Sequence, residues 1–242
     1  MLEWVAERRC QVGETSFQLS MLVKVESSPQ CFWLAKNRPL VEFYARLVEE
    51  LKPDRILEFG MLDGGSLALL AELGDPDCLV GVDIGEPPSD ALERFIRSRG
   101  LRVHPYWGTD QADRTAVTAI LDQEFDGPID LVIDDASHLL APSLTTFNTV
   151  FPRLRPGGSY VLEDWGWAHR LAAPPVDVGE FLTQAPLTRM VVEATMTCAS
   201  RNDIVESVAI DQDTVTIVRG PAHLDADFDL SASYDPGSQP IF

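Results

Sequence analysis

The 242-residue sequence has no long apolar run, no closely paired cysteines and few basic residues. No stretch approaches the roughly 18 apolar residues that a membrane-spanning helix needs. The amino-terminal residues mix charges among apolar side chains, unlike a secretory signal. The four cysteines lie far apart with no C-x-x-C pair, which argues against a zinc site and a disulfide framework and suits a reducing cytosol. We therefore expect a cytoplasmic protein without membrane partners.

The shortage of basic residues excludes one class of partner. The chain has 19 Lys and Arg against 38 Asp and Glu, a formal net charge of −19. Nucleic-acid binding needs basic surface to displace counterions from phosphates, so we expect no nucleic-acid partner. A small neutral or cationic molecule, or a carbohydrate, is the expected ligand class.

The length suits one α/β domain with additions. We expect an amino-terminal lid or dimer segment over residues 1–36, a main domain over 37–220 and an acidic tail over 221–242. Phe17, Met21 and Phe32 are candidates for contacts in a homodimer or a higher homo-oligomer. The tail is expected to be a mobile flap or a segment that orders on a partner subunit.

From Asn37 onward the pattern alternates between helix and strand. Apolar residues recur at helical spacing as far as Leu51, just before Pro53. Short apolar strands then alternate with helices, which predicts a parallel sheet with helices on both faces. Ile204–Ile210 and Thr214–Arg219 flank a polar turn and predict a terminal β-hairpin. The expected fold is a Rossmann-like, doubly wound, seven-stranded α/β sheet that ends in an antiparallel hairpin. The expected parallel strands are Arg55–Phe59, Cys78–Ile84, Leu101–Tyr106, Ile129–Ile133 and Ser159–Leu162.

A glycine-rich turn follows the first of these strands. Glu58 lies near the strand end, and Gly60, Gly64 and Gly65 precede Ser66 at the start of a helix. Glycines let a backbone bend tightly around a ligand, and ligands of α/β sheets bind outside the carboxyl ends of strands. The spacing is neither G-x-G-x-x-G nor a P-loop. A tight turn without any ligand is the alternative interpretation.

Two further acidic residues are candidates for the same ligand. Asp83 ends the second strand, about 20 residues beyond the glycine turn, where a carboxylate can accept both hydroxyls of a ribose that lacks a 2′-phosphate. Asp83 capping a turn is the alternative. Asp110 could accept from the exocyclic amine of adenine and Trp107 could cover the ring, although a simple loop cap explains Asp110 equally well.

Carboxylates gather where the fourth and fifth strands end. Asp134 and Asp135 close one strand, and Glu163 and Asp164 close the other. Neighbouring strands lie about 4.8 Å apart, and crowded carboxylates repel unless they are protonated or bind a cation. Hard oxygen ligands select Mg²⁺, Mn²⁺ or Ca²⁺ over zinc. Because side chains alternate along a strand, we expect Asp134 to point away and Asp135, Glu163 and Asp164 to bind the metal.

His138 follows the metal candidate Asp135 by three residues. A neutral imidazole beside a metal-bound hydroxyl can remove its proton near neutral pH, and the metal lowers the pKa of that hydroxyl. We therefore predict that His138 is the catalytic base. A capping role is the alternative for His138, and His169 is the rival base.

Three segments carry a family resemblance. Residues 58–66 resemble the E/D-x-G-x-x-x-G-G-S motif I of class I methyltransferases, in which the glycines pack against S-adenosylmethionine. Residues 133–138 (IDDASH) and 161–165 (VLEDW) resemble those of the cephalosporin hydroxylase-like and macrolide-sugar O-methyltransferase group. The resemblance covers roughly residues 37–220. It implies Mg²⁺ (or Mn²⁺) on Asp135, Glu163 and Asp164, with His138 as base and Asp135 also beside the cofactor.

The resemblance implies transfer of a methyl group from S-adenosylmethionine to a sugar hydroxyl, of a natural-product deoxysugar or of a bacterial saccharide. The reaction would be an in-line displacement assisted by His138. Trp33, Trp165 and Trp167 could form an aromatic platform for the sugar, with burial in the core as the alternative. A metal-dependent methyltransferase of phenols or catechols is a second possibility, and a non-catalytic protein that binds the cofactor is a third. The loop Leu171–Val178 and the amino-terminal segment are expected to cover the acceptor.

Overall fold

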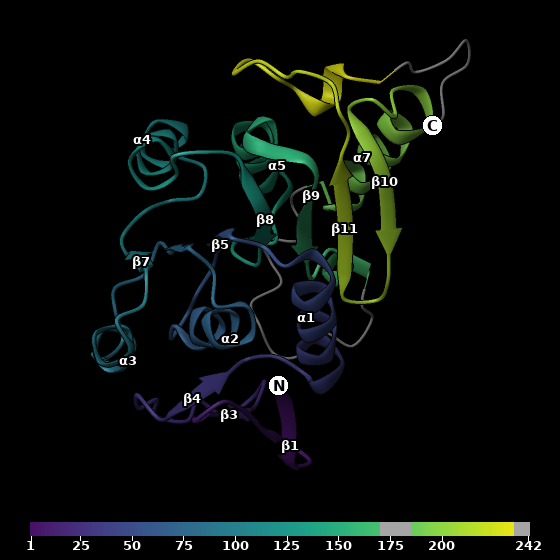
Figure 1. Cartoon of the computed structure of the whole chain (residues 1–242). Helices are drawn as coiled ribbons and strands as arrows, with labels where there is room; N and C mark the ends of the chain where they lie inside the picture. Colours follow the sequence, from purple (N-terminus) through teal and green to yellow (C-terminus); the bar gives the residue numbers. More distant parts are fainter. Residues whose placement is uncertain (170–184, 235–242) are drawn as a thin grey trace. The chain divides into compact units, whose positions relative to one another are not determined.

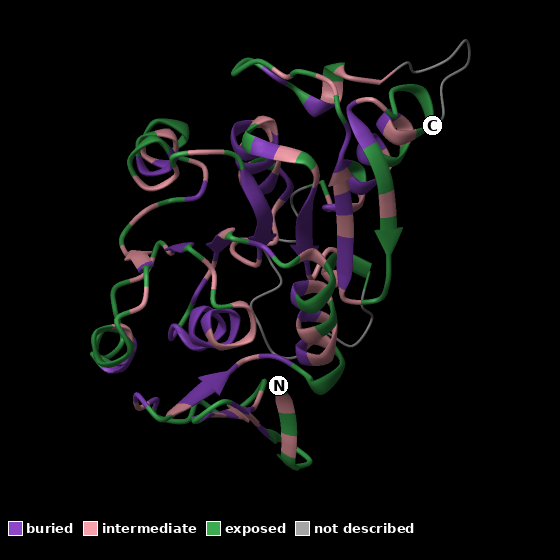
Figure 2. Ribbon diagram, in the orientation of Figure 1, coloured by how far each residue is buried: buried purple, intermediate pink, exposed green. Residues whose placement is uncertain are grey.

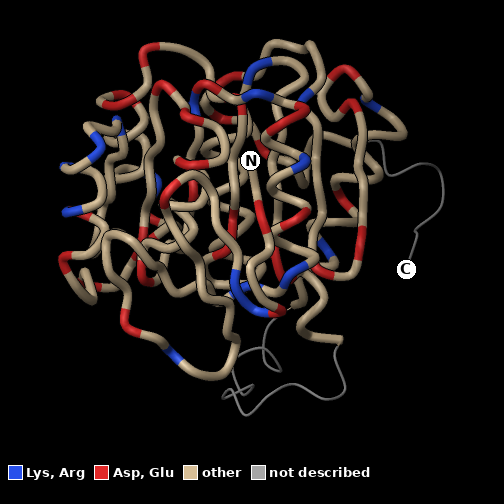
Figure 3. The backbone as a smooth tube through the Cα atoms, turned by 60° about the horizontal axis from the view of Figure 1, so that its bottom comes forward, with Lys and Arg blue, Asp and Glu red and all other residues tan. Residues whose placement is uncertain are grey.

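The computed structural model describes residues 1–169 and 185–234, and the chain forms two compact units, Met1–Asp110 and Gln111–Phe242 (Figure 1). The expected acceptor loop Leu171–Val178 and the end of the acidic tail lie outside the described residues. No helix among the described residues is long and apolar enough to cross a membrane. The sequence has 38 acidic and 19 basic residues, and Figure 3 marks the positions of both kinds along the backbone.

The first unit begins with a small sheet that the sequence did not predict as a whole. Its strands are β1 (Leu2–Ala6), β2 (Arg9–Val12), β3 (Thr15–Leu19) and β4 (Cys31–Leu34). The first three pair antiparallel, and β4 joins β3 in parallel. Phe17 and Phe32 are completely buried and stack at 6.3 Å between ring centroids. The expectation that these two phenylalanines contact another subunit is therefore wrong, because they form the core beneath this sheet. Met21 is exposed, so a subunit contact there stays a prediction.

The rest of the first unit is a parallel α/β layer. Its elements are α1 (Arg38–Leu51), β5 (Arg55–Phe59), α2 (Gly65–Gly74), β6 (Cys78–Val82), α3 (Ala91–Arg99) and β7 (Val103–Tyr106). Strand β6 pairs in parallel with β5 and with β7, and every residue of β6 is buried (Figure 2). A near-continuous apolar run is typical of a parallel strand covered on both faces.

Local chemistry sets the bounds of α1. The Asn37 side chain accepts a hydrogen bond from the backbone N–H of Leu40 at 2.9 Å, which satisfies one of the free donors at the helix start. Val41, Tyr44 and Val48 form its buried face. The helix ends at Lys52 with φ +46°, in the left-handed conformation, directly before Pro53.

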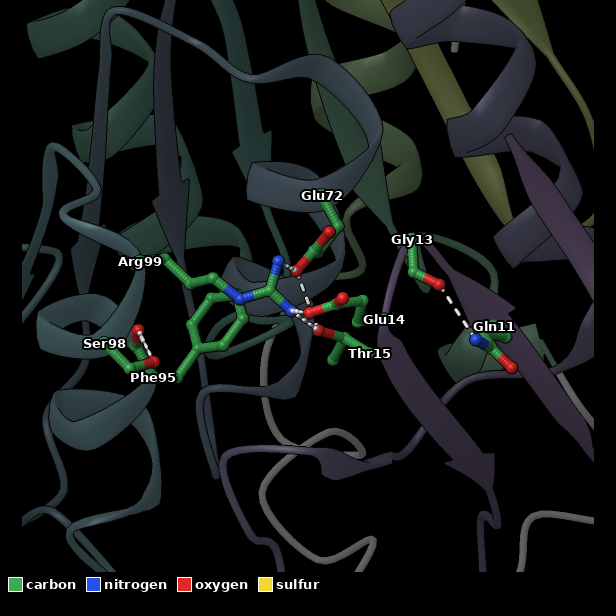
Figure 4. A network of polar contacts seen from close by, with 8 residues as sticks. All are labelled: Gln11, Gly13, Glu14, Thr15, Glu72, Phe95, Ser98 and Arg99. Carbon is green, nitrogen blue, oxygen red and sulfur yellow. Dashed lines mark hydrogen bonds and ion pairs between the residues drawn. The ribbon is translucent and has the colours of Figure 1, made fainter.

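A polar cluster ties the small sheet to the helices of the first unit (Figure 4). Arg99, at the end of α3, lies 3.2 Å from a carboxylate oxygen of Glu72 on α2 and donates to Thr15 at the start of β3. Thr15 in turn donates to Glu72 at 2.7 Å. The amino-terminal sheet is thus fixed to the α/β layer by side-chain contacts as well as by apolar packing.

The second unit carries the remaining strands. Its elements are α4 (Arg114–Glu124), β8 (Ile129–Asp134), α5 (Leu140–Val150), η1 (Phe151–Arg153), β9 (Leu154–Glu163), η2 (Trp167–His169), α7 (Thr188–Ser200), β10 (Val205–Ile210), β11 (Thr214–Arg219) and η3 (Leu230–Ala232). All six residues of β8 are buried, and β8 pairs in parallel with β9. Strand β11 pairs antiparallel with both β9 and β10, which confirms the predicted terminal hairpin.

The strands follow the order β10-β11-β9-β8-β5-β6-β7 in one seven-stranded sheet, which confirms the expected fold class. Three details differ from the sequence prediction. Strand β9 begins at Leu154, before the predicted start at Ser159, and includes Gly157, which has φ +75°. Helix α7 was not predicted. Residues 228–230 of the tail pack within the second unit, where Leu230 is fully buried, so this part of the tail is not a mobile flap.

Candidate functional site

The glycine turn in the first unit is a left-handed bend between β5 and α2. Gly60 has φ +85° and Gly64 has φ +81°, both in the region that glycine adopts without steric cost. Leu62, between them, has φ +49°. A non-glycine residue in this conformation is strained unless its surroundings hold it there.

Asp83, which directly follows β6, holds that bend. One of its carboxylate oxygens accepts from the backbone N–H groups of Met61 (2.9 Å) and Leu62 (2.8 Å). The other oxygen accepts from the N–H of Gly85 at 2.7 Å. In the structure Asp83 therefore caps the turn, as the alternative interpretation of this residue predicted. A carboxylate has about four lone-pair sites, so these three bonds leave capacity for a ribose hydroxyl.

Gly65 is required for a reason that the sequence did not reveal. A Cβ atom on Gly65 would lie 2.1 Å from the backbone oxygen of Trp33 on β4. The small sheet thus approaches the start of α2 more closely than any side chain permits. Trp33 is 9% exposed, and its indole N–H donates to the backbone oxygen of Ser20. The interpretation of Trp33 as a core residue holds here, and its place in an acceptor platform is not supported.

Asp63, in the middle of the glycine turn, is also anchored. Its side chain is 3% exposed, accepts a hydrogen bond from the Ser27 hydroxyl and lies 2.9 Å from the ammonium group of Lys24. The segment that carries Ser27 and Lys24 was expected to cover an acceptor. In the structure it contacts the glycine turn.

The other predicted cofactor residues of the first unit differ in exposure. Glu58 on β5 is completely buried and accepts from the Ser66 hydroxyl at 3.0 Å. Asp110 is exposed, at the end of a loop in which the Thr109 N–H donates to the Asp83 backbone oxygen. The structure therefore places the loop that contains Thr109 and Asp110 beside the one that follows β6.

In the second unit the structure brings three predicted residues together. One ligand atom from each of Asp135, His138 and Asp164 lies within 4.8 Å of the other two. His138 Nε2 is 3.9 Å from an Asp135 carboxylate oxygen. All three side chains are partly exposed. Asp135 directly follows β8 and Asp164 directly follows β9, so two parallel neighbouring strands deliver them to one edge of the sheet.

The remaining carboxylates of this region behave differently. Glu163 is 2% exposed and is not a member of the three-residue group, so the group contains His138 where the sequence suggested Glu163. Asp134 is 1% exposed and accepts from the Tyr160 hydroxyl at 2.8 Å and from Gln111 at 3.0 Å. Burial raises the pKa of Asp134, and the hydrogen bonds from Tyr160 and Gln111 oppose that shift. As expected, the Asp134 side chain is buried in the interior and does not belong to the three-residue group.

Two strained turns present this group. His138 and Asp164 both have φ +55°. The imidazole of His138 lies 4.9 Å from the Trp167 ring at an interplanar angle of 31°, and the Asp164 N–H donates to the backbone oxygen of Asp213 at 2.8 Å. The Trp165 indole N–H donates to the backbone oxygen of Asp211. The turn of the β10–β11 hairpin therefore supports the segment after β9. His169, the rival base, is exposed and is not in the group.

The donor set fits a divalent cation. The carboxylates of Asp135 and Asp164, with ligand atoms within 4.8 Å of each other and still partly open to solvent, offer oxygen ligands and leave room for water or a hydroxyl, with the His138 imidazole beside them. Without a cation, Asp135 and Asp164 would repel each other.

Two supporting residues had no signal in the sequence. Gln111 is buried behind the group, and Asp213 lies in the turn between β10 and β11. Neither belongs to a motif, since a glutamine before a helix and an aspartate in a hairpin turn are common.

Comparison with known proteins provides a second, independent kind of evidence about this chain. Residues 57–165 match a family described as a methyltransferase domain, which spans the glycine turn and both acidic strand ends. Residues 57–165 are therefore similar to a methyltransferase domain, and the strand order is the one expected for the class I methyltransferase fold. Ligands of such α/β sheets bind outside the carboxyl ends of parallel strands, where both candidate sites lie.

Several curated relatives of this chain are named as O-methyltransferases. It is 54% identical over 122 residues to mycinamicin VI 2''-O-methyltransferase of Micromonospora griseorubida, covering 48% of this chain and 28% of the relative. It is 42% identical over 101 residues to a rhamnosyl tetracenomycin-C 2'-O-methyltransferase of Streptomyces olivaceus, covering 42% and 24%. The chain spans about a quarter of the length of these relatives.

Solved structures support the methyltransferase fold. The MycE methyltransferase of the mycinamycin pathway, in complex with Mg, SAH and mycinamycin VI, has a TM-score of 0.58 at 22% identity, covering 83% of this chain and 51% of that one. The O-methyltransferase TomG of Streptomyces achromogenes, in complex with SAM, has a TM-score of 0.53 at 22% identity, covering 77% and 82%. At this identity the likeness concerns the fold alone.

Proposed function

We propose that this protein is an S-adenosylmethionine-dependent O-methyltransferase that methylates a hydroxyl of a sugar with the help of a divalent cation. The observation that carries the proposal is the group Asp135, His138 and Asp164, whose ligand atoms lie within 4.8 Å of one another beyond the ends of β8 and β9. Two curated relatives are named for methylation of compounds with a rhamnosyl or an olivosyl group, at 42% and 54% identity, which supports a sugar as acceptor.

The cofactor would bind to the glycine turn. Glu58, Gly60, Gly64, Gly65 and Ser66 are its proposed contacts there, with Asp83 for the ribose and Asp110 for the adenine. Gly65 and Asp83 are already committed to packing and to backbone hydrogen bonds. Their contribution is therefore to hold the turn in its binding shape before the cofactor arrives, which lowers the entropic cost of binding.

Asp135 and Asp164 would hold Mg²⁺ or Mn²⁺, and Glu163 remains a proposed third ligand. A bound cation of this kind lowers the pKa of a coordinated hydroxyl and orients it. Glu163 is almost fully buried, whereas Asp164 is partly exposed, so separate substitutions can test the two residues. Replacement of Asp164 by Asn should weaken metal binding directly, whereas Glu163→Gln tests whether the buried carboxylate is a ligand as well.

His138 is the proposed base. Its imidazole would accept the proton of the acceptor hydroxyl, which leaves that oxygen free to take up the methyl group in line. Bound S-adenosylmethionine would supply the methyl group, and its sulfur would keep the electron pair of the broken carbon–sulfur bond as a neutral thioether. The proton then passes from His138 to solvent. The Trp167 ring, 4.9 Å from the imidazole, restricts the orientation of the His138 side chain. Such positioning matters because the proposed reaction depends mainly on alignment and proton removal.

The test is a screen of acceptors with methyl-labelled S-adenosylmethionine. Macrolides and aromatic polyketides that bear an unmethylated deoxysugar are compared with catechol, each with Mg²⁺, with Mn²⁺ and with EDTA. We expect labelled product from at least one glycoside, none from catechol, and none in EDTA. Transfer to catechol alone would replace the sugar by a phenol, and equal transfer in EDTA would remove the cation from the mechanism. Cofactor binding without transfer to any acceptor would favour a non-catalytic role.

A further inference from the structure

A buried glutamine lies behind the proposed metal group in the second unit. Gln111 is 6% exposed and precedes α4. Its amide nitrogen donates to a carboxylate oxygen of Asp134 at 3.0 Å and to the hydroxyl of Thr146 at 2.9 Å. Its amide oxygen accepts from the backbone N–H of Ser137 at 2.9 Å. Both donors and the acceptor of this side chain are therefore in use.

The partners of Gln111 are themselves fixed. Asp134 is the last residue of β8 and also accepts from the hydroxyl of Tyr160 on β9. Thr146 lies on α5, is fully buried, and donates to the backbone oxygens of Gln111 and Pro142. Gln111 thus belongs to a closed network that joins β8 and β9 to α5, and its position has little freedom.

The contact with Ser137 extends this network into the proposed site. Ser137 lies in the turn between Asp135 and His138, and His138 has the strained φ of +55°. Strained backbone of this kind persists only where the surroundings fix it. The hydrogen bond to Gln111 is a direct tether from the rigid interior to the segment that presents both side chains.

We infer that Gln111 is a positioning residue that fixes the Asp135–His138 turn and thereby sets the geometry of the metal group. The inference rests on the proposed function for its catalytic consequence. A purely structural glutamine would only satisfy the buried carboxylate of Asp134, as Tyr160 does. The bond to the Ser137 N–H is what separates the two roles, because it acts on the turn and not on the core.

The experiment compares three variants of the full chain with the wild type. Gln111→Met keeps the length of the side chain and removes its three hydrogen bonds. Tyr160→Phe removes a bond to Asp134 without touching the turn. Gln123→Ala changes an exposed glutamine on α4 and is the matched control. For each variant we measure hydrogen exchange of the peptide that contains residues 136–139, equilibrium binding of Mn²⁺ alone, and the melting temperature.

We expect Gln111→Met to raise the exchange rate of this turn at least about tenfold and to weaken Mn²⁺ binding by about 10–100-fold, the range typical of changes just behind metal ligands. Tyr160→Phe should lower the melting temperature and leave the other two quantities within about twofold of the wild type. Gln123→Ala should change none of them. If Gln111→Met resembles Tyr160→Phe in all three measurements, the inference is wrong.

A second variant covers the case in which Gln111→Met does not fold. The double variant Gln111→Glu/Asp134→Asn keeps an acceptor oxygen for the Ser137 N–H and an N–H donor between the two side chains, without a second buried carboxylate. The exchange rate of the turn should therefore stay near that of the wild type, and a loosened turn would overturn the inference. Failure of the wild type itself to bind Mn²⁺ or to transfer methyl groups would count against the proposed function. A normal wild type with an unaffected Gln111→Met would count against Gln111 alone.

Discussion

The glycine turn and the metal group are built in opposite ways. In the glycine turn, acidic side chains point inward to the chain's own groups: Asp83 binds three backbone N–H groups, and Asp63 binds Ser27 and Lys24. In the metal group, Asp135 and Asp164 stay partly exposed with their ligand atoms close together. One region uses carboxylates to shape the backbone, and in the other we propose that carboxylates bind a cation.

This difference predicts which property each region controls. Changes in the glycine turn remove interactions that hold the native fold, so they should lower stability together with cofactor binding. Changes in the metal group remove mutual repulsion as well as a ligand, so they should lower activity without lowering stability.

The largest effect is expected from the metal group. Asp135→Asn and Asp164→Asn should each reduce kcat/KM for methyl transfer by more than about 100-fold, since even changes behind metal ligands cost about 10–100-fold. The melting temperature without metal should be unchanged or higher, because one of two close charges is gone. Steady-state kinetics measures the change in kcat/KM, and calorimetry on the same preparations measures the change in melting temperature. A fall in the melting temperature equal to that of a core mutation would show that these carboxylates are structural.

The next effect concerns Gly65→Ala. The added Cβ would lie 2.1 Å from the Trp33 backbone oxygen, and backbone has little freedom to yield. Overpacking of this kind costs about 1–3 kcal/mol and occasionally more, and we expect a loss near the upper end of that range. Urea unfolding measures the loss. Gly166→Ala, beside the metal group, is the matched control, because its Cβ would meet only the Gln212 backbone oxygen at 3.8 Å. Equal losses in the two variants would contradict the close approach of β4 to α2.

A smaller effect is expected at Asp83. Asp83→Ala leaves the N–H groups of Met61, Leu62 and Gly85 without their acceptor, which should cost about 1–3 kcal/mol and weaken binding of S-adenosylhomocysteine. Asp83→Asn keeps one acceptor oxygen and should lose less of both. Calorimetric titration and urea unfolding give the two quantities. Weaker binding with unchanged stability would assign Asp83 to the ribose alone and not to the turn.

Lys24→Met should have a modest effect. Lys24 is half exposed, so its ion pair with Asp63 is partly screened, and exposed pairs contribute up to about 1 kcal/mol. The loss on mutation should shrink at high salt. Urea unfolding at low and high ionic strength measures it. A loss that does not depend on salt would mean that the contact of the Lys24 ammonium group with the Trp33 ring, 5.6 Å to its centroid, and not the ion pair with Asp63, stabilises the segment.

The smallest expected signal is the reactivity of Cys10. Burial raises the pKa of its thiol to about 11, so at a pH of about 8, below the usual thiol pKa, it stays protonated and should not react with a thiol reagent in the native protein. Cys31 and Cys198 are partly exposed and should react first. Because the folded pKa lies above the unfolded value of about 8.5, the contribution of Cys10 to stability should disappear as pH rises from there towards the folded pKa. Mass spectrometry of labelled peptides identifies the reacting cysteine, and rapid native labelling of Cys10 would contradict its burial.

Much of the fold could be predicted from the sequence because apolar residues recur at the regular spacings of helices and strands. Strands β5 and β11 begin and end where the pattern indicated. The small amino-terminal sheet was missed because β2 and β4 have only four residues each. Helix α7 was missed because Val191, Val192 and several threonines are weak helix formers. Tertiary packing of Met190 and Ala194 overrides that propensity.

The candidate site was partly predictable. Strand ends and alternation placed Asp135 and Asp164 together and turned Asp134 inward, as the structure has them. Alternation alone did not separate Glu163 from Asp164, because the left-handed backbone at Asp164 is set by the Asp213 contact from the distant hairpin. The same holds for Gln111, whose partners come from β8 and α5. Long-range hydrogen bonds of this kind leave no local pattern.

The most direct measurement is a Mn²⁺ titration, followed by electron paramagnetic resonance, of the wild type and the double variant Asp135→Asn/Asp164→Asn. We predict one Mn²⁺ site in the wild type, competed by Mg²⁺ and absent from the double variant, at an unchanged melting temperature. A wild type that binds no Mn²⁺, or a double variant that keeps the site, would contradict a cation held between the ends of β8 and β9.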